Sequence, residues 1–297
     1  MVNVQDPQSS IARVGALVMG YQKDLVREIG LRFFRNWYLD HRYFRELNSL
    51  TLTDLKQRRA FEPELLILPH VLKRGDVAFD VGANMGIYSY QLARICGAEN
   101  VLSFEPLPSL ARWCRRILPK VQLLEIACSS EEGTSKFRIP MVGDREIVWR
   151  STLEIDRPEE GETDSKIIEV KTQRIDSFFS QRNMSRLDFV KIDVEGHERT
   201  TIQGGAEVFR HHHPTLLVEI EQRHHDFPIE QVFEDLRQLG YELRFFQLQS
   251  GQFHPIGDFS VAGMQEVDPT GSTYVNNFWA VAPGSDALKK IDAFRAR

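Results

Sequence analysis

The chain has 297 residues, of which 42% are hydrophobic and 27% charged, which is typical of a globular protein and excludes disordered and fibrous classes. Its formal net charge of −5 lacks the basic excess of a dedicated nucleic-acid binder. No apolar run approaches the roughly 18 residues of a membrane span, and the run Val14–Met19 is too short for a typical secretion signal. The three cysteines show no zinc-binding spacing. We therefore expect a reduced, cytoplasmic protein without nucleic-acid or integral-membrane contacts.

Residues 1–60 mix apolar and basic side chains in a helical pattern and carry no strand pattern. We predict two or three helices there. Two interpretations stay open: an appendage that packs on the rest of the protein, or a lid over a pocket. The lid interpretation is reasonable because segments added to an α/β core often cover its ligand-binding site.

Residues 75–220 alternate apolar strand patterns with amphipathic helix patterns, the first two helices over about 85–95 and 108–117. Strands separated by helices form βαβ units, so the pattern predicts an α/β fold with a mostly parallel sheet and helices on both faces. The predicted strands are 77–81, 101–104, 121–127, 189–193 and 216–219.

Two further segments depart from this alternation. Residues of about 140–176 interrupt it, and Glu154–Ser165 is rich in Asp, Glu, Gly and Pro, which predicts an exposed loop insertion. After residue 228 we expect a helix over about 229–239, followed by two strands, 241–246 and 278–281.

The first strand ends in a glycine-rich turn, Asp80-Val81-Gly82-Ala83-Asn84-Met85-Gly86. Gly82 permits a tight turn and a close approach of a ligand to the backbone. Asn84 is one of the few residue types that tolerate a left-handed conformation. By itself such a turn indicates nucleotide binding only weakly, and an ordinary strand-to-helix turn is the alternative.

Glu105 strengthens the case, because it closes the second predicted strand 25 residues after Asp80. Carboxyl ends of adjacent parallel strands face one crevice, where an acid can accept hydrogen bonds from both ribose hydroxyls. The Asp80 carboxylate would repel a pyrophosphate and attract an ammonium or sulfonium group. The turn also lacks the G-x-G-x-x-G spacing of dinucleotide sites. Together these features favour S-adenosyl-L-methionine over NAD. Pro106 flanks Glu105, and we expect it to shape a slot for the adenine ring.

Three motifs in combination resemble the FkbM family of methyltransferases, which has the class I Rossmann-like methyltransferase fold. They are Arg74–Gly86, Phe104-Glu105-Pro106, and Val190–Glu198, which contains Lys-Ile-Asp-Val-Glu-Gly-His-Glu. The resemblance covers roughly residues 60–225 and the final strand at Asn277–Val281. It implies a methyltransferase domain over 61–297, carrying the insertion at about 140–176, after an N-terminal helical appendage or lid over 1–60.

The resemblance also implies roles for individual residues. Asp80, Gly82 and Asn84 are expected to contact the methionine part of the cofactor, and Glu105 the ribose. The turn after the third strand, which contains Cys128, is where such folds contact adenine. The complete predicted cofactor set is Glu62, Asp80, Gly82, Ala83, Asn84, Gly86, Glu105, Pro106, Cys128 and Ser129.

Asp193, Glu195 and His197 cluster after the fourth strand and are the predicted catalytic residues. An acceptor hydroxyl loses its proton when it is methylated, so a base within hydrogen-bond reach assists the transfer. We expect Asp193 to face the methyl group and the acceptor. The histidines at 211–213 and 224–225 do not predict a metal site, because adjacent histidines splay apart. Asp193, Glu195 and Glu219 remain an alternative set of ligands for a divalent ion, but we predict no metal.

These observations predict an S-adenosyl-L-methionine-dependent O-methyltransferase that acts on a hydroxyl of a small molecule or glycan. Two alternatives stay open. One is a catalytically silent module that binds the cofactor or a partner, and the other is an NAD(P)-dependent oxidoreductase on a similar fold. The sequence names neither the acceptor nor the oligomeric state, because a fold supplies a reaction type and not a substrate.

Overall fold

The computed structural model describes residues 51, 62–158, 161–269 and 271–295. The helices predicted within residues 1–60 lie outside these ranges, apart from residue 51. No helix in the described ranges is long and apolar enough to cross a bilayer.

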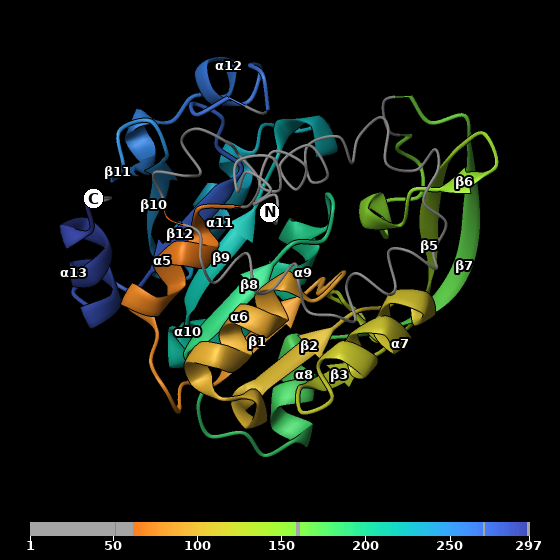
Figure 1. The fold of residues 1–297 in the computed structure, drawn as a ribbon, viewed down its shortest axis with the longest axis horizontal. Helices are drawn as coiled ribbons and strands as arrows, with labels where there is room; N and C mark the ends of the chain where they lie inside the picture. The colour runs from red at the N-terminus through yellow and green to blue at the C-terminus, as the bar shows by residue number, and fades with distance from the viewer. Residues whose placement is uncertain (1–50, 52–61, 159–160, 270, 296–297) are drawn as a thin grey trace, which may run out of the picture.

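The described residues are organised around one large sheet (Figure 1). Five contiguous strands of this sheet pair in parallel, and the strand at Asn277–Val281 runs antiparallel between its neighbours. In spatial order the eight strands are β11 (Gln252–Pro255), β10 (Glu242–Gln247), β12 (Asn277–Val281), β9 (Thr215–Glu219), β8 (Phe189–Ile192), β1 (Ala78–Val81), β2 (Val101–Phe104) and β3 (Gln122–Leu124).

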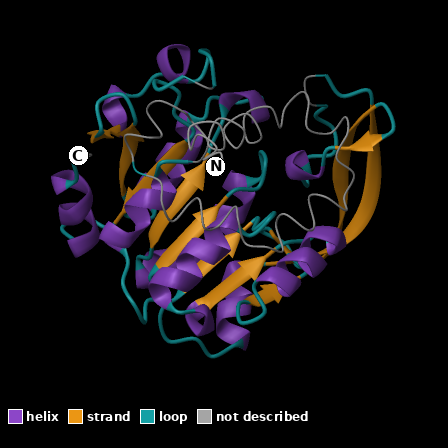
Figure 2. Cartoon of the chain, in the orientation of Figure 1, coloured by secondary structure: helices purple, strands orange, loops and turns teal. Residues whose placement is uncertain are grey.

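Helices cover both faces of this sheet (Figure 2). One face packs on α5 (Glu64–Val71), α6 (Ile87–Cys96), α7 (Pro108–Ile117) and α13 (Asp286–Ala293). The other packs on α8 (Ile175–Gln181), α9 (Glu198–Gly204), α10 (Ala206–His212) and α11 (Glu230–Gln238). Shorter turns are η2 (Ala98–Asn100), η3 (Val148–Arg150), η4 (Gln222–His224), η5 (Ile256–Asp258) and α12 (Val261–Met264).

The central strands read as apolar runs because both of their faces are buried. All four residues of β1 are buried, and they alternate between the two cores. Ala78 joins the core under α6, whereas Phe79 and Val81 join the core under α8 and α9. The expected α/β fold, with a mostly parallel sheet and helices on both faces, is confirmed.

A second, smaller sheet departs from the sequence expectation. The single strand predicted over 121–127 is wrong, because the chain leaves the large sheet after β3 and enters this other sheet at β4. Much of the predicted insertion is also strand, since β5 and β7 pair antiparallel from Gly133↔Thr172 to Met141↔Asp164. The sheet order is β4 (Ala127–Cys128), β7 (Asp164–Gln173), β5 (Gly133–Val142) and β6 (Arg145–Glu146).

Candidate active site

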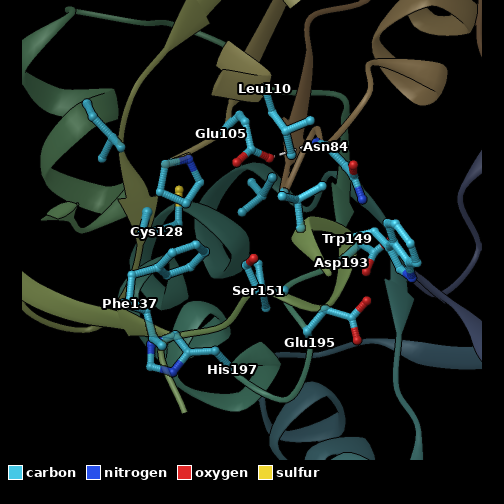
Figure 3. Close-up of a pocket in the computed structure, with 18 residues that line it drawn as sticks. Asn84, Glu105, Leu110, Cys128, Phe137, Trp149, Ser151, Asp193, Glu195 and His197 are labelled. Carbon is cyan, nitrogen blue, oxygen red and sulfur yellow. Dashed lines mark hydrogen bonds between the residues drawn. The ribbon is translucent and has the colours of Figure 1, made fainter. Parts of the chain in front are cut away.

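A cavity lies at the carboxyl ends of β1, β2 and β8. This is the end of a parallel sheet at which α/β proteins bind their ligands. Strand β5 of the second sheet and the segment that joins its strands β6 and β7 form one wall (Figure 3). The lining residues from this part of the chain are Phe137, Val148, Trp149, Ser151 and Leu153. The insertion therefore helps to build the site.

The glycine-rich turn after β1 forms the floor of the cavity and has the backbone conformation that the sequence predicts. Gly82 has a φ of +83° and Asn84 a φ of +49°, so both are left-handed. A Cβ on Gly82 would lie 1.7 Å from the backbone oxygen of Asp193, a distance that only glycine avoids. The Asn84 side-chain oxygen is buried and has no hydrogen-bond partner among the described residues. This oxygen is a free acceptor at the cavity.

Glu105 joins the end of β2 to this turn. One carboxylate oxygen accepts from the backbone N–H of Asn84 at 2.8 Å, and the other accepts from that of Leu107 at 2.8 Å. Burial raises the pKa of Glu105 to about 7, although both backbone hydrogen bonds favour the ionised form. Glu105 therefore holds the turn in place. It also presents to the cavity a carboxyl group whose pKa of about 7 lies near neutral pH.

Asp80 lies behind the turn and is not among the residues that line the cavity. Its side chain points to the α6 face of the sheet, where the Ser89 hydroxyl donates to it, and only 1% of the residue is exposed. Burial raises the pKa of Asp80 to about 6, with Ser89 and Lys191 acting in the opposite direction. In this structure the Asp80 side chain therefore binds α6 and does not face the cavity.

Asp193 lines the cavity at the end of β8 and is paired with a buried lysine. The Lys191 ammonium lies 3.7 Å from Asp193 and 3.6 Å from Glu219, and donates to the Asn277 side-chain oxygen at 2.8 Å. Burial raises the pKa of both carboxyl groups, and that of Glu219 rises well above its usual range. The Lys191 ammonium acts against burial in both cases and favours the ionised form of each carboxyl group. The sequence contains a signal for this network that the motif analysis does not use: a lysine within an otherwise apolar strand. Lysine is almost never fully buried unless it is paired, so such a position indicates buried polar partners.

Glu62 belongs to the same network and does not line the cavity. Its carboxylate accepts from the Tyr88 hydroxyl and, at 2.8 Å, from the Asn277 amide. Since Asn277 also binds Lys191, Glu62 is linked to Asp193 through two side chains.

Glu195 and His197 follow Asp193 along the cavity edge. Glu195 is left-handed with a φ of +50°, and its carboxylate lies 3.4 Å from His224. His197 is held by Glu154 and Ser129. Neither Glu154 nor Trp149 was singled out as a site residue from the sequence, because nothing local in the insertion shows that it folds back onto the cavity.

The structure thus brings most of the predicted set to one cavity. Those lining it are Gly82, Asn84, Glu105, Pro106, Cys128, Asp193, Glu195 and His197. The remaining predicted residues, Glu62, Asp80, Ala83, Gly86 and Ser129, lie beside or behind the cavity wall.

The sequence profile of the methyltransferase FkbM domain matches residues 80–243, which is more than half of the chain. The chain belongs to the FkbM methyltransferase family. With the sheet order, this membership makes it an S-adenosyl-L-methionine-dependent methyltransferase of the class I Rossmann-like fold, as expected from the sequence.

Two curated relatives are similar over part of their length. The 2-O-methyltransferase NoeI of Sinorhizobium fredii is 28% identical over 145 residues, which cover 46% of this chain and 59% of NoeI. The AMB antimetabolite synthetase AmbE of Pseudomonas aeruginosa is 26% identical over 165 residues, covering 45% of this chain and 8% of AmbE. The match thus spans less than two thirds of either relative.

Solved structures give distant matches. The methyltransferase FkbM of Methylobacillus flagellatus has a TM-score of 0.44 at 12% identity, covering 74% of this chain and 51% of that one. The O-methyltransferase of Bacillus cereus, solved with S-adenosylhomocysteine, has a TM-score of 0.39 at 12% identity, covering 92% and 99%.

Proposed function

We propose that the protein transfers a methyl group from S-adenosyl-L-methionine to a hydroxyl group of a small molecule or glycan. The observation that carries the proposal is that Asn84, Glu105 and Asp193, from three adjacent strand ends, line one cavity. The name of NoeI, a 2-O-methyltransferase, supports oxygen as the acceptor atom.

The residues present fit the cofactor. The unpartnered Asn84 oxygen can accept a hydrogen bond from an ammonium group, and the Glu105 carboxylate has capacity to accept from ribose hydroxyls beside its two backbone donors. The apolar side chains of Pro106, Leu110 and Phe137 suit a flat base. When bound, the cofactor supplies an electrophilic methyl group on a sulfonium centre.

Asp193 is the group we assign to the acceptor. Its side chain is 29% exposed, more than that of Glu219, and it faces the cavity. As a carboxylate it can accept the hydroxyl hydrogen, orient the oxygen and take the proton as the new bond forms. Its burial raises its pKa, which makes it a better base. Trp149 and Glu195 flank Asp193 and form the wall that the acceptor would contact (Figure 3).

Binding and turnover experiments test this proposal in two steps. Isothermal titration with S-adenosylmethionine, S-adenosylhomocysteine and NAD is expected to show binding of the first two only. Incubation with isotopically labelled S-adenosylmethionine and a panel of sugars, glycans and hydroxylated or amino-bearing small molecules is then expected to label a hydroxyl. NAD binding alone would favour an oxidoreductase. Cofactor binding without transfer to any member of a broad panel would favour a silent module, and transfer to nitrogen would refute the oxygen acceptor.

A further inference from the structure

Lys191 is a fully buried cation within β8, and its ammonium group is enclosed by side chains from three other segments. The ammonium donates a hydrogen bond to the side-chain oxygen of Asn277 at 2.8 Å. Carboxylate oxygens of Asp193 and Glu219 lie 3.7 Å and 3.6 Å from it. The ring of Tyr88 lies 4.9 Å away and covers a further side. An ammonium group has three N–H donors, which matches the three oxygens around it.

The amide of Asn277 is held in the orientation that suits the lysine. Its nitrogen donates to a Glu62 carboxylate oxygen at 2.8 Å, which leaves its oxygen for Lys191. A flipped amide would turn its N–H groups towards the ammonium and its oxygen towards a carboxylate, so the two contacts together settle the orientation. Glu62 therefore fixes the amide, and the amide fixes the ammonium beside Asp193.

Strand geometry places Lys191 behind Asp193. Residues two apart in a strand point to the same face, and Asp193 directly follows β8. Asp193 lines the cavity, and 29% of its side chain is exposed. Lys191 is not among the lining residues. The lysine can therefore act on the carboxylate without contacting a ligand in the cavity.

The surroundings of Asp193 and Lys191 hold many acids. Burial raises the pKa of Asp193, and the Lys191 ammonium acts in the opposite direction. The charged and titratable groups around these two residues in the described ranges are Glu62, Glu64, Asp80, Tyr88, Glu105, Glu195, Glu198 and Glu219. None of them is basic, so the positive charge that favours an ionised Asp193 in this group is that of Lys191.

We propose that Lys191 is a positioning residue that keeps Asp193 ionised and aimed at the acceptor hydroxyl. The inference rests on the proposed function, because it needs Asp193 as the base of methyl transfer. The acceptor oxygen gives its proton to Asp193 as it bonds to the methyl carbon, whose bond to sulfur breaks with the electron pair staying on sulfur. A base is most effective when its pKa lies near the working pH. Burial makes Asp193 a stronger base, and the ammonium keeps it from being protonated before the acceptor arrives.

Two substitutions with opposite expected effects test this balance through the pH profile of turnover, measured with an acceptor labelled in the panel above. Lys191→Met removes the positive charge, so the acid limb of the profile is expected to move up by about 1–3 pH units, the effect of an opposite charge in contact. Glu62→Gln removes a negative charge that disfavours ionised Asp193 and keeps the hydrogen-bond acceptor, so the limb is expected to move down by up to about one unit. Lys289→Met replaces a lysine of α13 that is 71% exposed, and this matched control is expected to shift nothing.

Carbon-13 NMR of the Asp193 carboxyl group follows the same ionisation without an acceptor, and Asp193→Asn identifies its signal. The Asp193 pKa is expected to move in the same direction as the acid limb in each variant. Affinity for S-adenosylhomocysteine and circular dichroism are the controls for the cofactor site and the fold. If Lys191→Met does not fold, the shift in Glu62→Gln, which retains the lysine, decides the matter.

An unchanged Asp193 pKa in folded Lys191→Met would overturn this inference and leave the proposed function standing. Shifts in the same direction in Lys191→Met and Glu62→Gln would also overturn it, because they would report a general disturbance and not a charge effect. A shift in the NMR titration with an unmoved turnover profile would show that the reaction does not use this ionisation, and would overturn it too. Methyl transfer to no member of the panel would overturn both the proposed function and this inference.

Discussion

Replacing Glu105 by glutamine is expected to weaken cofactor binding in a pH-dependent way. Burial raises the pKa of Glu105 to about 7, so roughly one tenth of the carboxyl is ionised at pH 6 and nine tenths at pH 8. Protonation removes acceptor capacity from a carboxyl group whose two oxygens each already hold a backbone N–H group, so we expect the ionised form to bind the ribose much more tightly. The wild-type affinity for S-adenosylhomocysteine should therefore rise about tenfold from pH 6 to pH 8.

Glu105→Gln keeps the shape of the side chain and removes the titration. At pH 8 we expect a loss of about 1.5–3 kcal/mol in binding free energy, the scale of hydrogen bonds to a charged group. Isothermal titration of both proteins at several pH values measures the effect, with near-ultraviolet circular dichroism as the control for folding. Asp80, whose pKa burial raises to about 6, remains in both proteins, so any pH dependence left in the variant reports on such other groups.

The reasoning is refuted if the folded variant binds S-adenosylhomocysteine as tightly as the wild type at pH 8. It is also refuted if the two affinity curves run parallel with pH, because the ionisation of Glu105 would then play no part in binding. In either case the ribose acid has to be sought elsewhere in the cavity.

Two further substitutions test the floor and the acceptor side of the cavity. Asp193→Asn is expected to leave S-adenosylhomocysteine affinity nearly unchanged and to lower turnover roughly 10²–10⁴-fold, as when a general base is removed; loss of cofactor binding instead would place Asp193 in the cofactor site. Gly82→Ala is expected to lower the free energy of unfolding in urea by about 3 kcal/mol or more, since its Cβ would meet the Asp193 backbone. Gly75→Ala is the matched control, because Gly75 is equally left-handed with open space around it, and about 1–2 kcal/mol is expected; equal losses in the two variants would contradict the steric argument.

Local pattern was enough to predict much of this protein. Apolar runs and helical spacing located the central strands and the first helices, since burial on both faces of a sheet leaves a signal within each segment. The left-handed Asn84 and the closeness of the Glu105 carboxylate to its turn also followed from the sequence, because parallel strands that are neighbours bring their carboxyl ends together.

Only the tertiary structure decided which polar side chains face the cavity and which lie behind it. Asp80 follows the alternation of β1 and points beneath α6, a direction that depends on which face of the strand packs on which helix. Lys191 of β8 is buried beside Glu219 of β9 and Asn277 of β12, which lie far away in the sequence. Such contacts depend on strand order, and strand order is not encoded in any one segment.

The insertion shows the same limit most clearly. Its acidic, glycine-containing loop has the composition of an exposed connection, yet the segment just before that loop, between β6 and β7, supplies Trp149, Ser151 and Leu153 to the cavity. Glu154 meets His197 across 43 residues of sequence because the backbone of Arg138 and Thr152 fixes where the loop lies. The sequence by itself determined the fold class, the methyltransferase family and the left-handed glycine-rich turn after β1, all of which have local signatures. The packing of distant segments decided the walls of the site and the partners of its charged groups, since no local pattern records which segments will meet.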